Sequence, residues 1–131
     1  MSLDPDRPEP AYQLGRWFAV LEKVQRDALG EKLSATIKDR FYTAASSTPA
    51  AILPRLIQLS QHHMHRIKKT GLRVTRERQI QEIACRLDAF PRRLDSEEQG
   101  LFHLGYYHQT HDLYTRKTAA EPSETADSRK E

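Results

Sequence analysis

Apolar residues recur at helical spacing through the interior of this 131-residue chain, and no strand-like alternation of apolar and polar residues persists there. The clearest case is the set Leu14, Trp17, Leu21, Val24 and Ala28, which would share one face of a helix. Similar patterns predict helices over residues 11–29, 34–45, 49–69, 74–90 and 96–117. The connections between them are short, so the pattern predicts an all-α fold, a compact bundle of about five helices.

Capping and stop signals support several of these helix ends. Thr48 offers an N-cap to the third helix, and Pro49 fits its first helical position. Asp95 and Glu98 have the spacing of a capping box at the start of the fifth helix. Pro91 is expected to end the fourth helix, because proline cannot donate a backbone hydrogen bond.

The two ends of the chain differ from its interior. Residues 1–10 hold Pro5, Pro8 and Pro10 among acidic residues, which predicts a disordered, extended leader. Residues 118–131 are predicted to form a disordered tail, since nothing large and apolar from 121 onward offsets the entropy of ordering. Residues 11–117 would then form the single helical domain, with no membrane span or secretion signal, which indicates a cytoplasmic protein.

Some residues inside the helices allow sharper expectations. Cys85 cannot form an internal disulfide and lies among apolar neighbours, so it is expected to be a small core residue in a reducing compartment. Gly100 and Gly105 in a helix interior suggest close helix approach. Arg76 would lie on the apolar face of the fourth helix, so either that helix begins later or the side chain snorkels outward. The expected apolar face of the third helix is Ile52, Leu56, Leu59, His63 and Ile67.

Positive charge is concentrated in the middle of the chain. Ten of the 21 Lys and Arg residues lie between Arg55 and Arg93 among only three acids, which gives this stretch a formal charge of +7. Such a surface favours a polyanion, most often nucleic acid bound through its backbone, although a solvated helix face is the simpler alternative. Nearby Phe41 and Tyr42 would either stack on unpaired bases or belong to the core. The candidate nucleic-acid-binding residues are Lys38, Arg40, Arg55, Arg66, Lys68, Lys69, Arg73, Arg76, Arg78, Arg86, Arg92 and Arg93.

The six histidines do not form a good metal-binding pattern. Adjacent His62 and His63 would diverge on a helix, so no metal or other cofactor is expected, and His63 and His108 are expected to be partly buried packing residues. The pair His111-Asp112 resembles the centre of HD-type metal-dependent phosphohydrolases, but the only aspartate downstream lies in the predicted tail. No catalytic residue is therefore assigned, and a hydrolase remains a remote alternative.

Two stretches resemble a known family. They are Thr36-Ile-Lys-Asp-Arg-Phe-Tyr-Thr-Ala-Ala-Ser-Ser-Thr-Pro49, continuing to Gln61-His62-His63, and Glu97-Glu-Gln-Gly-Leu-Phe-His-Leu-Gly-Tyr-Tyr-His-Gln109. With the segment from Ala11 to Arg16, they resemble the C-terminal helical domain of the large subunit of the type I-C CRISPR effector complex, Cascade. Met1 directly before the leader resembles the internal start that yields a separate small subunit, although an excised domain of the large subunit would look identical.

The resemblance implies a noncatalytic helical subunit of a CRISPR antiviral defence complex, with several functions expected of it. It would be present in more than one copy, bridge the large subunit and the backbone subunits that carry the crRNA, and stabilise the R-loop through the displaced non-target strand or the guide-target duplex. Its expected partners are thus copies of itself, those subunits, crRNA and target DNA, with Tyr107 and Tyr114 as candidate protein contacts. A purely architectural spacer whose basic face binds an acidic protein is the alternative. The copy number, the binding by the isolated chain and the individual contacts stay open.

Overall fold

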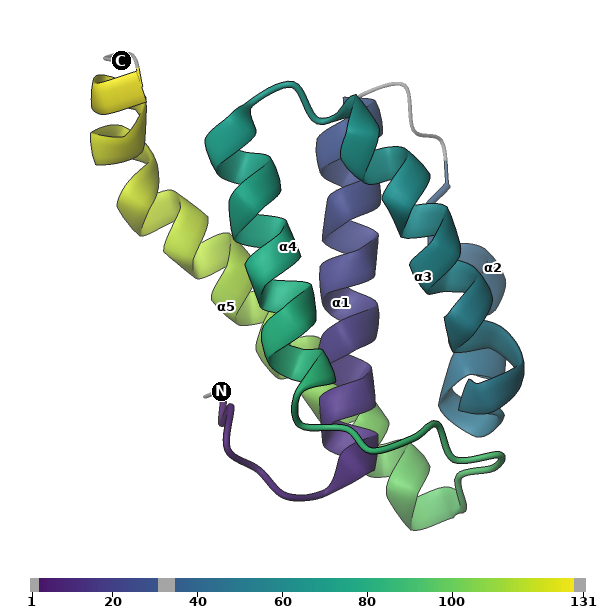
Figure 1. The fold of residues 1–131 in the computed structure, drawn as a ribbon. Helices are drawn as coiled ribbons and strands as arrows, with labels where there is room; N and C mark the ends of the chain where they lie inside the picture. The colour runs from purple at the N-terminus through teal and green to yellow at the C-terminus, as the bar shows by residue number, and fades with distance from the viewer. Residues whose placement is uncertain (1–2, 31–34, 129–131) are drawn as a thin grey trace.

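Five helices make up the fold. The computed structural model describes residues 3–30 and 35–128, with side chains described as far as residue 115. The helices are α1 (Pro10–Leu29), α2 (Ile37–Ser47), α3 (Pro49–Arg66), α4 (Thr70–Ala84) and α5 (Ser96–Ser128). No strand occurs in these described ranges, and the prediction of a compact all-α bundle is confirmed (Figure 1). No helix among the described residues is both long and apolar enough to cross a bilayer.

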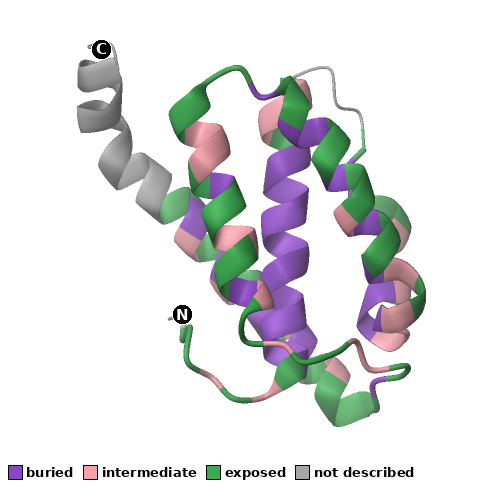
Figure 2. Cartoon of the chain, in the orientation of Figure 1, coloured by how far each residue is buried: buried purple, intermediate pink, exposed green. Residues whose placement is uncertain are grey.

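Helix α1 is the central element of the bundle. It lies between α3 and α4, with α5 crossing it, and every residue from Ala11 to Gln25 is buried (Figures 1 and 2). Its apolar residues join the core, which also takes residues from each of the other four helices. Because α1 is covered on all sides, its polar residues must also find partners inside the protein.

Helices α1 and α5 meet at two glycines. A Cβ atom on Gly105 would collide with the backbone carbonyl of Tyr12, and one on Gly15 would collide with the backbone carbonyl of Phe102. The close approach predicted for Gly105 is therefore confirmed. Gly100 has open space where its Cβ would be, so the same prediction was wrong for that residue.

Aromatic side chains pack edge to face beside this crossing. The ring of Phe18 lies 5.4 Å from Tyr42 and 6.1 Å from Phe102, and Tyr42 lies 5.1 Å from Tyr106, measured between ring centroids. Edge-to-face packing of this kind stabilises the fold beyond the contribution from burial of the rings. Tyr42 thus packs against the core, which decides between the two roles left open for it.

Several predicted helix ends need correction. Helix α3 ends at Arg66 and α4 begins at Thr70, because buried Ile67 adopts an extended conformation and directs the chain away from the helix. Helix α4 ends at Ala84, well before Pro91. Predicted helix 34–45 instead spans Ile37–Ser47, with Thr36 and Asp39 in a capping box.

The segment after α4 crosses the α2–α3 corner instead of continuing as helix. The backbone N–H of Ala50 donates to Pro91 O at 3.1 Å, and that of Leu94 donates to Ser47 O at 2.9 Å. Phe90 stacks on Trp17 with ring centroids 5.5 Å apart. These contacts compete with a longer helix and explain its early end.

Cys85 is exposed, so the prediction of a core residue was wrong. It is the C-cap of α4, and helical spacing puts it about 200° from buried Ile83, on the opposite side of the helix. Apolar neighbours in sequence do not show on which side of a helix a residue lies.

The described part of the leader has no helix before Pro10 but lies against the bundle. The Gln13 amide donates to Pro5 O at 3.1 Å and to Arg7 O at 2.8 Å, and Arg86 pairs with Asp6 at 2.9 Å. At the other end, α5 continues to Ser128, beyond the end predicted near Lys117. The predicted disorder of residues 118–131 stays a prediction.

Candidate nucleic-acid interface

Helix α3 and the turn that follows it contain no acidic residue. The chain has neither Asp nor Glu between Asp39 and Glu77. The N-terminal part of α4, which follows the turn, belongs to the same stretch. Cations on this surface therefore have no acidic neighbours in sequence to neutralise them.

Most of the predicted binding residues are exposed on this surface or beside it. Eight of the twelve are solvent-exposed and form no ion pair or side-chain hydrogen bond with any residue that the structure describes. They are Arg40, Arg55, Arg66, Lys68, Lys69, Arg78, Arg92 and Arg93. Exposed guanidinium and ammonium groups without an internal partner are available to bind phosphate.

Five of the eight exposed cations lie at the two ends of α3. Arg66, Lys68 and Lys69 surround its C-terminus, whereas Arg92 and Arg93 follow Pro91, which is hydrogen-bonded to the first turn of α3 through Ala50. The 18 residues of α3 span about 27 Å, so the two groups are well separated. The candidate interface is an elongated surface and not a single patch.

Arg76 does not belong to this surface. It is only 5% exposed, and its guanidinium donates to Asp27 at 2.7 Å and to Gln79 at 3.0 Å. Asp27 also accepts from Lys23 at 2.8 Å, so two buried cations share this carboxylate. Neither of the settings expected for Arg76 occurs, because Asp27 of α1 pairs with it inside the bundle. We remove Arg76 from the candidate set.

Arg86 and Arg73 are partly occupied by contacts within the protein. Arg86 pairs with Glu82 at 3.0 Å and with Asp6 of the leader at 2.9 Å. The hydrogen bond that Arg86 donates to Asp6, followed by the contacts with Glu82, raises the pKa of Arg86, although partial loss of solvent opposes this. Arg73 donates to Ile67 O at 3.3 Å, which helps to hold the α3–α4 turn. Their first role is therefore to hold the leader and the turn.

Lys38 is surrounded by aromatic rings. Its ammonium nitrogen lies 5.1 to 5.3 Å from the centroids of Tyr42, Tyr106 and Tyr107, and 3.4 Å from the Tyr107 hydroxyl. These contacts stabilise the cation on the α2–α5 boundary. Lys38 is thus already engaged by aromatic rings of α2 and α5.

The histidines take the packing roles that the sequence predicted. Buried His63 has a lowered pKa, because burial disfavours its charged form and Arg66 and His62 repel it. Burial likewise lowers the pKa of half-buried His108, whose Nδ1 lies 2.8 Å from the Tyr12 hydroxyl. Among the residues with described side chains, no three His, Cys, Asp or Glu residues come together to hold a metal ion.

Sequence reasoning missed a polar network inside the bundle. Buried Arg16 on α1 donates to Gln109 of α5 at 2.8 Å and to Gln13 at 2.7 Å. Its remaining nitrogen contacts Glu82 of α4 at 3.2 Å. On another part of α1, Glu22 accepts from the Tyr106 hydroxyl, and burial followed by this contact raises the pKa of Tyr106. The available signal was that Arg16, Lys23 and Asp27 have helical spacing and share one side of α1, apart from its purely apolar face.

Comparison with protein families identifies a matching family model. Residues 1–114 match the model of a family described as CRISPR-associated protein (Cas_Csd1). No curated protein matches the chain.

Proposed function

Because the chain belongs to the Cas_Csd1 family of CRISPR-associated proteins, we propose that it is a noncatalytic small subunit of type I-C Cascade in the cytoplasm. In this role it binds nucleic-acid backbone without sequence preference and stabilises the R-loop. It also bridges the large subunit and the backbone subunits. The family carries the CRISPR assignment, and the exposed cations support the contact with nucleic acid.

The observation that carries this proposal is the acid-free surface of α3 with its unpaired cations. Lys68 and Lys69 are both exposed in the α3–α4 turn, next to exposed Arg66. Phosphate contacts made by such groups release counterions and do not read base sequence. Since R-loop formation is nearly balanced in free energy, a few such contacts are enough to shift it.

Apolar side chains on α5 support the bridging role. Leu104, Tyr107 and Tyr114 are 44%, 46% and 41% exposed, and their spacing puts them on one side of the helix. Exposed aromatic residues in a row are typical of protein contact surfaces. This face is proposed to contact another Cascade subunit or a second copy of the chain.

The alternative is a spacer that supports assembly while its basic face binds an acidic protein surface. It explains the same charges, but it predicts that neutralising them leaves R-loop stability unchanged once the complex has assembled. For the hydrolase alternative, the described residues offer no supporting cluster of ligands.

The deciding experiment compares R-loop formation on matched duplex DNA by Cascade assembled with two charge-matched double variants. Lys68→Gln with Lys69→Gln removes two unpaired cations, whereas Arg7→Gln with Arg26→Gln removes two that are paired with Glu9 and Glu22. We expect normal assembly with both variants and fewer R-loops with the first alone. Equal R-loop formation by both assembled complexes would favour the spacer.

A further inference from the structure

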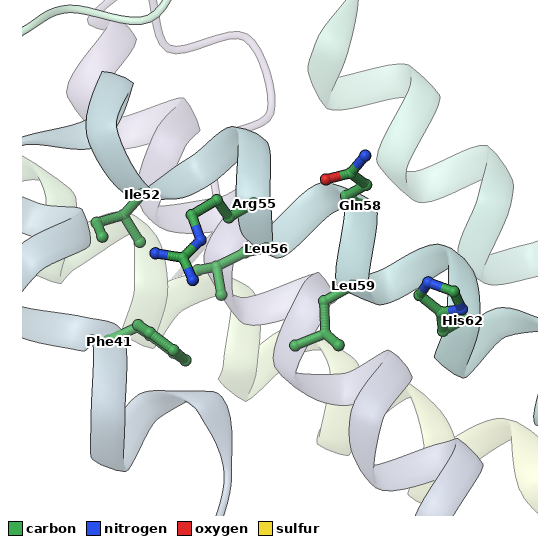
Figure 3. A pocket seen from close by; sticks show the side chains of 7 residues that line it. All are labelled: Phe41, Ile52, Arg55, Leu56, Gln58, Leu59 and His62. Carbon is green, nitrogen blue, oxygen red and sulfur yellow. The ribbon is translucent and has the colours of Figure 1, made fainter.

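A groove lies between α2 and α3, on the acid-free part of the surface. It has a volume of about 330 Å³, and Phe41, Ile52, Leu56 and Leu59 form its apolar lining (Figure 3). Its polar lining is Arg55, Gln58 and His62.

Two of the apolar residues are more open than a core position requires. Phe41 is only partly buried, and Leu59 is 36% exposed although the sequence predicted it on the buried face of α3. The core side of α3 instead takes Leu53, Ser60 and Met64, which are turned away from this groove. A phenyl ring and a leucine therefore remain available for a ligand at the α2–α3 boundary.

The charge around the groove favours an anionic ligand. No acid lines it, and Arg55 is exposed without a partner among the described residues. Arg40 precedes Phe41, and Arg66 lies about one turn beyond His62 along α3. The site thus combines a planar apolar ring with a planar cation, both of which line the groove (Figure 3).

From this combination we propose that the groove holds one unpaired base of a single-stranded nucleic acid, with a neighbouring phosphate on Arg55. The base would stack on Phe41 and contact Leu59, and Gln58 and His62 would face its polar edge or its sugar. Aromatic stacking with backbone neutralisation is the usual way in which single strands are bound without sequence readout. The inference rests on the proposed function and adds a base contact to its phosphate contacts.

A nucleotide fits the groove better than an acidic peptide. An amphipathic helix or strand would need a row of apolar pockets at regular spacing, whereas this site offers a single short pocket beside one ring. Guanidinium planes also stack on bases, which a carboxylate side chain cannot exploit. An acidic peptide is therefore kept as an outcome of the test.

The test measures binding of the full chain to two oligonucleotides by fluorescence anisotropy. One is an eight-residue oligothymidylate with a central 2-aminopurine, and the other has an abasic site at that position. The first variant is Phe41→Leu, which keeps an apolar side chain but removes the ring, and its matched control is Tyr107→Leu, which removes an exposed ring on α5. Arg55→Lys keeps the positive charge but removes the planar guanidinium group, whereas Arg55→Gln removes the charge as well.

We expect Phe41→Leu to weaken binding of the base-containing strand about fivefold, the lower end of the effect of losing one stacked base, and to leave the abasic strand unchanged. Tyr107→Leu should affect neither strand. Arg55→Gln should weaken binding of both strands. Arg55→Lys should recover binding of the abasic strand more fully than binding of the base-containing strand. Quenching of 2-aminopurine fluorescence should disappear with Phe41→Leu.

Three results would overturn the inference. In the first, the wild-type chain binds both strands equally, or Phe41→Leu binds them as the wild type does. If Lys68→Gln with Lys69→Gln still weakens binding in that case, the proposed function stands without the groove. In the second, an octaglutamate peptide binds in a Phe41-dependent manner and the oligonucleotides do not. In the third, the wild-type chain binds neither strand, which contradicts the proposed backbone contact as well.

Discussion

At the scale of single residues, Arg76 and Arg78 show how differently two arginines of one helix can behave. Arg78 is exposed, whereas Arg76 is buried against Asp27. The side chains of Arg76, Asp27 and Lys23 are 6%, 5% and 5% exposed, so each charge depends on the others in place of water. A buried charge that loses its partner is costly because the remaining group is still desolvated.

We predict that Arg76→Ala lowers the free energy of unfolding by about 3 kcal/mol, as expected when a buried ion pair loses one partner. The matched variant Arg78→Ala should change it by less than about 0.5 kcal/mol, since it removes an exposed side chain. Urea denaturation followed by circular dichroism measures both values. Equal effects of the two substitutions would contradict the structural role given to Arg76.

A second prediction at this scale concerns pH. The pKa of His63 is lowered from 6.5 in the folded chain, mainly by burial, so the unfolded chain binds more protons near this pH. The stability that comes from neutral His63 is complete above about pH 6.5 and decreases as the pH falls toward the folded pKa. The free energy of unfolding should therefore fall between pH 7 and pH 5.

His63→Gln should make that fall shallower, and His65→Gln, an exposed neighbour on α3, should leave it unchanged. Denaturant titrations at several pH values provide the comparison. An identical pH dependence in the wild type and both variants would show that the fold does not lower the pKa of His63.

At the scale of the helices, the crossing of α1 and α5 is set by glycine. At Gly15 and Gly105 a Cβ atom would meet the backbone of the other helix and not a movable side chain. Neither helix can then yield without separating the two axes, which would also open the aromatic packing around Phe18. The glycines thus determine how closely the longest helix approaches the central one.

Two substitutions in α5 should consequently have opposite effects. Gly105→Ala should lower the free energy of unfolding by about 3 kcal/mol through overpacking. Gly100→Ala, where the added methyl meets open space, should raise it by about 0.5 to 1 kcal/mol through better helix propensity. Thermal unfolding distinguishes the two signs. If Gly105→Ala were neutral or stabilising, the close crossing would be refuted.

At the scale of the whole molecule, five of the exposed cations form two groups at opposite ends of α3. Helix α3 separates them by about 27 Å, whereas a stacked strand advances by about 3.4 Å along its axis per nucleotide. A stacked strand therefore needs about eight nucleotides to reach both groups. Affinity for single strands should depend on length for this reason.

With a 16-nucleotide strand, Lys68→Gln with Lys69→Gln should reduce the slope of log affinity against log salt by about 1.4, from about 0.7 for each phosphate contact. Arg92→Gln with Arg93→Gln should reduce it by a similar amount. With a four-nucleotide strand, either double variant should weaken binding only about twofold, since the other group remains available. Anisotropy titrations over a salt series test this, and an unchanged slope for the second variant would remove Arg92 and Arg93 from the interface.

The sequence determined the features that depend on near neighbours along the chain. Helical periodicity and the capping residue Asp95 specify helices, and the acid-free stretch after Asp39 specifies where positive charge gathers. Local hydrogen bonds and side-chain spacing within a turn are sufficient for this. The resemblance in two motifs was equally readable, and the family match agrees with it.

Only the tertiary structure decided which side chains of those helices meet one another. It buried Arg76, exposed Cys85 and Leu59, and left Phe41 at the edge of a groove. The burial of Arg76 depends on Asp27, far away in sequence, and the early end of α4 depends on contacts such as that of Phe90 with Trp17. Burial is a property of the packed helices together, so the sequence pattern of one helix cannot show which of its positions the neighbouring helices will cover.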